Sequence, residues 1–255
     1  MSVPPTEQAL QELVTRGLIA AEPPPQALGA GNIDRRNEAK RTAWRVTLPA
    51  GGQARLILGF DLAELAAKQA AFAEACPDIA TTRSFYAKLD GCEALAETFF
   101  DGPNLADAAT NATVPEPVLV GALRKITDSL AASESPSTEA ARHSEWQAWS
   151  DRLLDLPVWQ SPERAILAQA LLPALYRELA NTSPATRWTN GDFLPSNILL
   201  NARGEARLID TEFAARTHFH AEDAARFRVL STLTSILPAL DSVLPAPALP
   251  WHIYF

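Results

Sequence analysis

The chain has 255 residues, of which 47% are hydrophobic and 20% charged, and its formal net charge is −8. This length can bury a sizeable core in one large domain or two lobes, and the composition is that of a soluble globular protein. The negative charge argues against a general binder of nucleic acid or of anionic membranes.

The few cysteines and the lack of a long apolar stretch bear on covalent chemistry and on location. Its two cysteines, Cys76 and Cys92, form no CxxC pair, so neither a disulfide framework nor a structural zinc site is expected. The first residues do not resemble a signal peptide, and the longest apolar stretch is too short to span a membrane. We therefore expect a cytoplasmic protein.

The first hundred residues alternate between strand and helix patterns. Helical spacing of apolar residues predicts one helix capped by Thr6 and another that follows Asp61, where Asp61 and Glu64 have the spacing of a capping box. Period-2 patterns predict a hairpin around a Pro/Gly turn in residues 42–60, followed by strands at 83–89 and 93–100. The expected order is strand, strand, helix, strand, strand.

The rest of the chain is mostly helical in pattern. Helices are predicted at 115–131, at 161–180 with Ser161 as its cap, and at 219–240. The three tryptophans near these helices are expected to pack a core, and the scattered histidines to lie on the surface. A turn at 101–104 is the candidate boundary between an N-lobe, 1–101, and a C-lobe, 102–255.

One segment combines apolar strands with polar side chains that do not suit a strand. Residues 188–214 read WTNGDFLPSNILLNARGEARLIDTEFA, and acids and amides are weak strand formers that are costly to bury unpaired. The runs at 198–200 and 206–209 predict a hairpin whose four-residue turn, NARG, contains Gly204 for a positive φ. Pairing Leu200 with Glu205 brings the two outer ends of the hairpin together.

The polar side chains of this segment then converge. Asn197 and Asp210 fall at the open end of the hairpin, Asp192 lies in the loop before it, and Glu212 lies nearby. Oxygen ligands suit Mg²⁺, which takes one or two from the protein and the rest from water and phosphate. Asp-x4-Asn with a downstream Asp is the arrangement of a kinase catalytic loop and its metal-binding aspartate. A solvated hairpin end with ordinary turn acids is the alternative.

The motif NGDFLPSNILL…LIDTEFA resembles that of the aminoglycoside phosphotransferase and choline kinase-like family. The resemblance implies an α+β, bilobal protein-kinase-like fold and an enzyme that uses ATP and Mg²⁺ to phosphorylate a hydroxyl of a small molecule. It assigns Asp192 as the catalytic base, Asn197 as a catalytic-loop magnesium ligand, Asp210 as the principal metal ligand and Glu212 as an acid near a second metal. The backbone of Thr98, Phe99 and Phe100 would meet the adenine.

The sequence also departs from this family in the part that grips the nucleotide. The strand at 54–60, ARLILGF, offers Leu58 or Gly59 where the family has a phosphate-binding lysine, and Lys40, Arg41 and Lys68 are candidate substitutes that lie elsewhere in the chain. The turn expected to cover the phosphates, 34–42, contains no glycine; GAGN at 29–32 is a weak alternative.

Two classes of function therefore stay open. One is an active small-molecule phosphotransferase, and the other is a kinase-like pseudoenzyme that acts as a nucleotide- or protein-binding module. No nucleic-acid or membrane partner is expected, and the sequence does not identify the acceptor. The apolar C-terminus, which includes Trp251 and Phe255, is a candidate contact for a protein partner. In the last predicted helix, Asp223 or Arg226 is expected to brace the catalytic loop.

Overall fold

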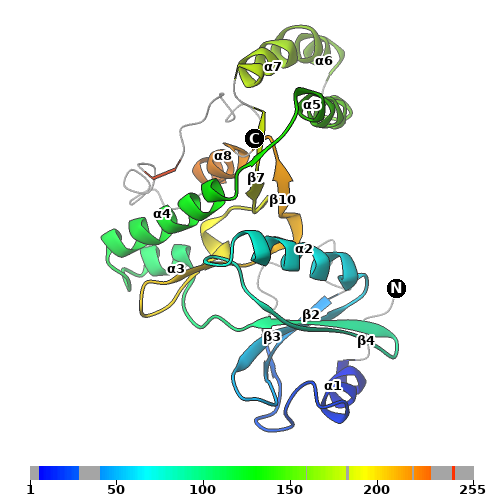
Figure 1. The fold of residues 1–255 in the computed structure, drawn as a ribbon, viewed down its shortest axis with the longest axis vertical. Coiled ribbons are helices and arrows are strands. Elements are labelled where there is room, and N and C mark those ends of the chain that lie inside the picture. Colours follow the sequence, from blue (N-terminus) through cyan, green and yellow to red (C-terminus); the bar gives the residue numbers. More distant parts are fainter. Residues whose placement is uncertain are drawn as a thin grey trace. The chain divides into compact units, whose positions relative to one another are not determined.

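The computed structural model describes residues 6–28, 41–158, 160–181, 184–219, 221–230 and 243–244. By contact, the chain forms two compact units (Figure 1). The first consists of Met1–Pro103 together with Leu199–Glu212, and the second of Asn104–Ile198 together with Phe213–Phe255. The α+β class predicted from the sequence is confirmed.

The first unit contains an antiparallel five-stranded sheet in the order β1-β2-β3-β5-β4. The predicted order of two strands, a helix and two strands is confirmed for β2 to β5, and the short strand β1 before them was not predicted. The predicted first helix is present, with Thr6 as its first residue rather than its cap. The elements are α1 (Thr6–Thr15), β1 (Gln26–Ala27), β2 (Arg41–Thr47), β3 (Gln53–Gly59), α2 (Leu62–Ala75), β4 (Arg83–Leu89) and β5 (Cys92–Thr98).

The two faces of this sheet are covered by different helices, as Figure 1 shows. On one face Leu56 and Leu58 of β3 lie in a buried cluster with Leu13 of α1. On the other face Ile57 lies in a cluster with Leu62 and other residues of α2. Because side chains alternate along a strand, the odd-numbered residues of β3 belong to the α2 face.

The beginning of α2 differs from the prediction. Asp61 has a φ of 56° and makes no side-chain capping bond, so the predicted capping box with Glu64 is wrong. The N–H of Leu62 donates instead to the carboxylate of Glu93 on β5. The carboxylate of Glu93, on a distant strand, thus accepts a backbone N–H at the start of α2, where a carboxylate close in sequence was expected to do so.

The hairpin of β8 (Ile198–Leu200) and β9 (Ala206–Leu208) is confirmed, with a shorter turn than predicted. The N–H of Asn201 donates to the carbonyl of Glu205 at 3.0 Å, which leaves three residues between them. The third, Gly204, has a φ of 74°, as three-residue hairpin turns require. The side-chain Oδ1 of Asn201 also accepts bonds from the backbone of Arg203 and Glu205.

The hairpin is fixed to the rest of the first unit by backbone contacts. Leu208 forms a parallel bridge with Ala80, and its N–H donates to the carbonyl of Ile79 at 2.7 Å. The N–H of Leu200 donates to the carbonyl of Pro103 at 2.9 Å. Residues from the late part of the chain thereby complete the first unit.

The second unit is mainly helical and includes one small sheet in the order β10-β7-β6. The strand β7 leads directly into the loop that begins at Asn190. The elements are α3 (Leu105–Thr110), α4 (Glu116–Ala132), β6 (Ser135–Pro136), α5 (Glu139–Leu154), α6 (Ser161–Ile166), α7 (Leu172–Ala180), β7 (Ala185–Thr189), the 3₁₀ turn η2 (Pro195–Asn197), β10 (Ala215–Thr217) and α8 (Ala221–Leu230).

The helix predicted at 161–180 is interrupted by a wider turn. A π-helical segment, η1 (Leu167–Leu171), joins α6 to α7, and the N–H of Leu172 donates to the carbonyl of Leu167. Ser161 is the first helical residue rather than the cap, and the N–H of Gln160 before it donates to Glu163 at 2.9 Å. The predicted end at Asn181 is confirmed.

Aromatic side chains form the core near these helices. Trp146 lies 5.1 Å from Trp149 and 6.0 Å from Phe219 between ring centroids, which confirms the predicted packing role of these tryptophans. His143 is exposed as expected. The surface prediction is wrong for His218, which is buried and bonds to Glu145 and to Ser137.

Several predicted features lie outside the described residues. They are the GAGN segment, Lys40, Trp159, His220, the part of the last helix beyond residue 230, and the apolar C-terminus from Trp251 to Phe255. No helix in the described part of the chain has the length and apolar character needed to cross a membrane.

Candidate active site

The loop from Asn190 to Asn197 is held by the first turn of α8. Asp223 accepts the backbone N–H of Asn190 on Oδ2 at 2.7 Å and that of Gly191 on Oδ1 at 3.0 Å. Asp223 is only 4% exposed, so two backbone donors and a desolvated carboxylate satisfy one another. The prediction that Asp223 braces the loop is confirmed.

Gly191 allows the loop to turn at this point. Its φ is 74°, and a Cβ built on it would lie 2.4 Å from the carbonyl oxygen of Phe213. Both the left-handed backbone and the close approach require glycine. The next residue but one, Phe193, is buried against Phe227 of α8, with 5.5 Å between ring centroids.

Asp192 and Asn197 are brought together within the second unit. The amide nitrogen of Asn197 donates to the backbone oxygen of Asp192 at 2.8 Å and to its carboxylate Oδ2 at 3.0 Å. With its nitrogen used in this way, Asn197 presents Oδ1 as its lone-pair-bearing side-chain atom. Asp192 and Asn197, which are five residues apart in the sequence, thus form a hydrogen-bonded side-chain pair in the structure.

A cation lies on the other side of the same carboxylate. Nη1 of Arg226 in α8 is 3.7 Å from Oδ1 of Asp192. The prediction that Arg226 contributes to bracing the loop is also confirmed. Asp192 is therefore oriented by an amide and a guanidinium, while its side chain stays 26% exposed to solvent.

The other two predicted metal ligands belong to the first unit. Asp210 is exposed, follows β9 and has a φ of 58°, a left-handed conformation that is unusual outside glycine and is concentrated at functional sites. Thr211 is 3% exposed, and its hydroxyl has no hydrogen-bond partner among the described atoms. Nowhere in the described part of the chain do three His, Cys, Asp or Glu side chains gather as a metal site. The predicted set of Asn197, Asp210 and Glu212 is divided between the two units and stays a prediction.

Glu212 contacts two of the basic residues that the sequence offered as substitutes for the missing lysine. Nη1 of Arg41 lies 2.8 Å from Oε2 of Glu212. Nζ of Lys68 donates to the backbone oxygen of Glu212 at 3.4 Å and pairs with Glu64 at 3.1 Å. Two cations from β2 and α2 thus meet at one residue.

A buried polar network that the sequence reading missed lies on the α2 face of the sheet. Glu97 on β5 is 2% exposed, and its Oε1 accepts from Nη1 of Arg55 on β3 at 2.9 Å. Its Oε2 accepts from Thr81 at 2.6 Å and from Gln69 at 3.2 Å. Breaking a buried pair by removing one partner costs about 3–5 kcal/mol, whereas a surface pair contributes about 0–1 kcal/mol.

The signal for this network was present in the sequence but depended on register. Arg55 and Glu97 are directly opposite residues of neighbouring strands, and opposite charges at such positions pair. Knowing that β3 pairs with β5 rather than only with β2 would have been necessary to recognise it.

Thr98, Phe99 and Phe100, the residues predicted to meet the adenine, line a cavity of about 540 Å³ within the first unit. Its other walls come from residues 80–82 and from the β8–β9 turn. The N–H of Thr98 donates to the carbonyl of Thr82 at 2.8 Å and that of Phe99 to Gln53 at 3.0 Å. These two donors are used inside the unit, so a nucleobase at this segment would rely on its carbonyl groups and on the N–H of Phe100. The adenine-binding role of Thr98 to Phe100 stays a prediction.

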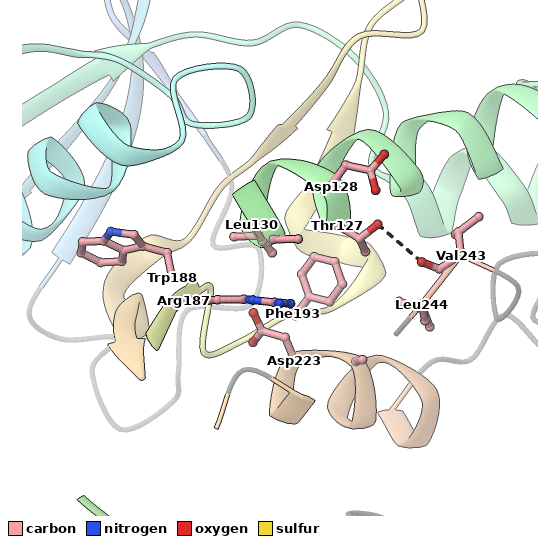
Figure 2. Close-up of a pocket in the computed structure, with 11 residues that line it drawn as sticks. Thr127, Asp128, Leu130, Arg187, Trp188, Phe193, Asp223, Val243 and Leu244 are labelled. Carbon is pink, nitrogen blue, oxygen red and sulfur yellow. Dashed lines mark hydrogen bonds between the residues drawn. The ribbon is translucent and has the colours of Figure 1, made fainter. Parts of the chain in front are cut away.

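A second cavity, of about 190 Å³, lies beside the loop from Asn190 to Asn197 in the second unit. Figure 2 shows Phe193 of the loop and Asp223 of α8 in its wall, with Leu130 of α4 beside them. Oγ1 of Thr127 donates across it to the carbonyl of Val243 at 3.4 Å. Asp223, which braces the loop, is thus one of the residues that line this cavity.

The chain was compared with protein families, curated proteins and solved structures, and only the solved structures match it. Neither a family model nor a curated protein matches the sequence. Among solved structures, a thermostable mutant of the aminoglycoside phosphotransferase APH(4)-Ia, in a ternary complex with AMP-PNP and hygromycin B, matches 96% of this chain and 87% of its own, with a TM-score of 0.64 and 13% identity.

Two other structures are similar over the same length. An aminoglycoside-3'-phosphotransferase of type VIII is 15% identical with a TM-score of 0.51, and the match covers 96% of this chain and 90% of that one. The apoenzyme of the macrolide 2'-phosphotransferase MphH from Brachybacterium faecium is 15% identical with a TM-score of 0.53, over 95% of this chain and 85% of that one. The chain therefore has the protein-kinase-like fold of the aminoglycoside phosphotransferases.

Proposed function

We propose that this protein is a phosphotransferase that moves the γ-phosphoryl group of ATP to a hydroxyl of a small molecule, with Mg²⁺ as cofactor. The observation that carries the proposal is the hydrogen-bonded pair of Asp192 and Asn197 in a loop held by Asp223. Its support from comparison is a fold whose solved examples include a phosphotransferase in complex with AMP-PNP and hygromycin B.

Asp192 is the residue proposed to act on the acceptor. Phosphoryl transfer needs in-line positioning and neutralisation of charge more than covalent help from the protein. A carboxylate fixed by Asn197 on Oδ2 and by Arg226 at Oδ1 can orient a hydroxyl and accept its proton. The bracing contacts from α8 supply the rigidity that such positioning requires.

The chemical kind of the donor atoms supports magnesium as the proposed ion. Asp210 offers an exposed carboxylate on a constrained backbone, and Asn197 presents a carbonyl oxygen because its nitrogen is used by Asp192. Hard oxygen donors of this kind are those that Mg²⁺ prefers. Asp210, Asn197 and Glu212 would hold the ion, which when bound supplies neutralisation of the phosphate charge.

A kinase-like module without catalysis is the second candidate, and the sequence of β3 favours it. This strand contains no lysine, and its basic residue, Arg55, is held by the buried carboxylate of Glu97. In this alternative the protein binds ATP or a protein partner but transfers no phosphate.

Incubation with γ-labelled ATP, Mg²⁺ and a pool of sugars, aminoglycosides, amino alcohols and cell metabolites separates the two. We expect label transfer by the wild type, with turnover reduced by about 10²–10⁴-fold in Asp192→Asn, the usual contribution of a general base. ATP affinity should stay unchanged in that variant. Asp151→Asn, an exposed acid on α5 in the same unit, is the matched control and should keep full activity.

The outcomes assign the function clearly. Transfer that survives Asp192→Asn undiminished would contradict the mechanism. ATP binding without transfer to any acceptor would favour the binding module. In the proposed enzyme, Asp210→Ala should abolish Mg²⁺-dependent stabilisation by ATP, which reaches about 2.7 kcal/mol at 100 times the Kd, while the ligand-free variant stays folded.

A further inference from the structure

The strand β3 offers no free cation to the phosphates of a bound nucleotide. Leu58 is fully buried in the cluster on the α1 face, and Gly59 has no side chain. Arg55 shares the α2 face but pairs with Glu97, whose side chain is 3% exposed. Releasing Arg55 would leave a buried carboxylate uncompensated, so Arg55 is a structural cation.

Arg41 lies on the neighbouring strand β2, beside the position at which β3 has no cation. It is directly opposite Gly59 in the β2–β3 ladder. Directly opposite residues project from the same face, with their Cβ positions only about 5 Å apart. The side chain of Arg41 therefore lies on the α2 face of the sheet. It is adjacent to Gly59, which has no side chain there.

The contacts of Arg41 and Lys68 converge on Glu212, two residues after Asp210. Arg41 pairs with its carboxylate at 2.8 Å, and Lys68 donates to its backbone oxygen at 3.4 Å. The side chains of Arg41, Lys68 and Glu212 are 22%, 40% and 33% exposed. Pairs this accessible to water can exchange partners at little cost, unlike the pair of Arg55 and Glu97.

We propose that Arg41 and Lys68 form a relocated clamp for the triphosphate of the nucleotide, and that Glu212 holds Arg41 in place while no nucleotide is bound. A planar guanidinium and a mobile ammonium are the two side chains suited to phosphate oxygens. On binding, the polyphosphate replaces the carboxylate of Glu212 as the partner of Arg41. The clamp rests on the proposed function for its nucleotide, but its recognition of polyphosphate can be measured without catalysis.

Affinities for Mg²⁺-ATP and for AMP, measured by calorimetry, test the clamp. We expect Arg41→Ala and Lys68→Ala each to weaken ATP binding by about 10- to 100-fold, the factor that a charge-assisted hydrogen bond contributes. AMP affinity and the melting temperature of the ligand-free variants should not change. Arg41→Lys should recover part of the loss, and Lys88→Ala, an exposed lysine on β4 of the same unit, should have no effect.

Inorganic tripolyphosphate without Mg²⁺ tests the placeholder role of Glu212 separately. Glu212→Gln should tighten tripolyphosphate binding by releasing Arg41, and Arg41→Ala should cancel that gain. Equal losses for ATP and AMP, or no loss in either variant, would overturn the clamp, as would a wild type that binds neither ATP nor tripolyphosphate.

Catalysis and the clamp can fail independently. If the wild type transfers phosphate and the two variants do so with unchanged KM for ATP, the clamp is wrong and the proposed function stands. If the wild type binds ATP through Arg41 and Lys68 but phosphorylates nothing, the clamp stands and the transferase is wrong.

Discussion

At the scale of single residues, Gly191 is a position in the loop from Asn190 to Asn197 that has no room for a side chain. Gly191→Ala places a Cβ 2.4 Å from the carbonyl of Phe213 on a backbone with φ of 74°. The left-handed conformation and the forced displacement together cost about 2–4 kcal/mol. Thermal unfolding should show a melting temperature lower by about 5–15 °C, and the proposed transferase activity should be lost because Asp192 is the next residue.

A second glycine provides the control. Gly121 lies on the exposed side of α4, where a Cβ would meet nothing within 4 Å. Gly121→Ala should raise stability by about 1 kcal/mol, as expected for a helix interior. A loss at Gly121 equal to that at Gly191 would contradict the argument from backbone geometry.

At the scale of elements, the parts of the fold that depend on local pattern were predictable. The strands β2 to β5 and the helix α2 follow from period-2 and period-3.6 spacing, and the Asp192–Asn197 pair follows from a short spacing in one loop. The cap of α2 was not predictable, because Glu93 reaches it from another strand. Arg41 and Glu212 are 171 residues apart in the sequence, so only the three-dimensional arrangement of β2 could bring them together.

The π-helical segment between α6 and α7 is explained by the packing of two leucines. Leu167 and Leu172, five residues apart, are both buried in the aromatic core. In a regular helix only residues three or four apart share a face, and the wider turn corrects the phase. Pro173 also lacks an N–H, and its ring would clash with the preceding turn of a regular helix.

Deleting exposed Ala168 together with Pro173→Ala should convert this segment into a continuous α-helix. The buried leucines would then be four residues apart, so we expect the melting temperature to match or exceed that of the wild type. Deleting Lys125 from α4 should instead rotate Ile126 and Leu130 off their buried face, at about 2–5 kcal/mol for each. Circular dichroism during heating would compare them, and equal destabilisation by both deletions would disprove the phase argument.

At the scale of the whole molecule, the first unit is assembled from two separated parts of the chain. Residues 1–103 alone should lack cooperative unfolding, because the hairpin supplies the buried side chains of Leu200, Ala206 and Leu208. A chimera that joins Pro103 to Leu199 through a short Gly/Ser linker should restore it, since Pro103 and Leu200 already share a hydrogen bond. Calorimetry of both fragments would decide, and Leu208→Asp in the chimera should abolish the recovery.

The same division affects how the protein is made. Arg207 donates to the carbonyl of Asp78, 129 residues earlier in the chain. At a synthesis rate of about 5–20 residues per second, this interval takes roughly 6–26 seconds on the ribosome. During that time the amino-terminal sheet emerges without the hairpin that completes the unit, and the backbone of Ile79 and Ala80, between α2 and β4, lacks its partner in β9. Nascent chains of this protein are therefore expected to need chaperone protection longest for the segment that is synthesised first.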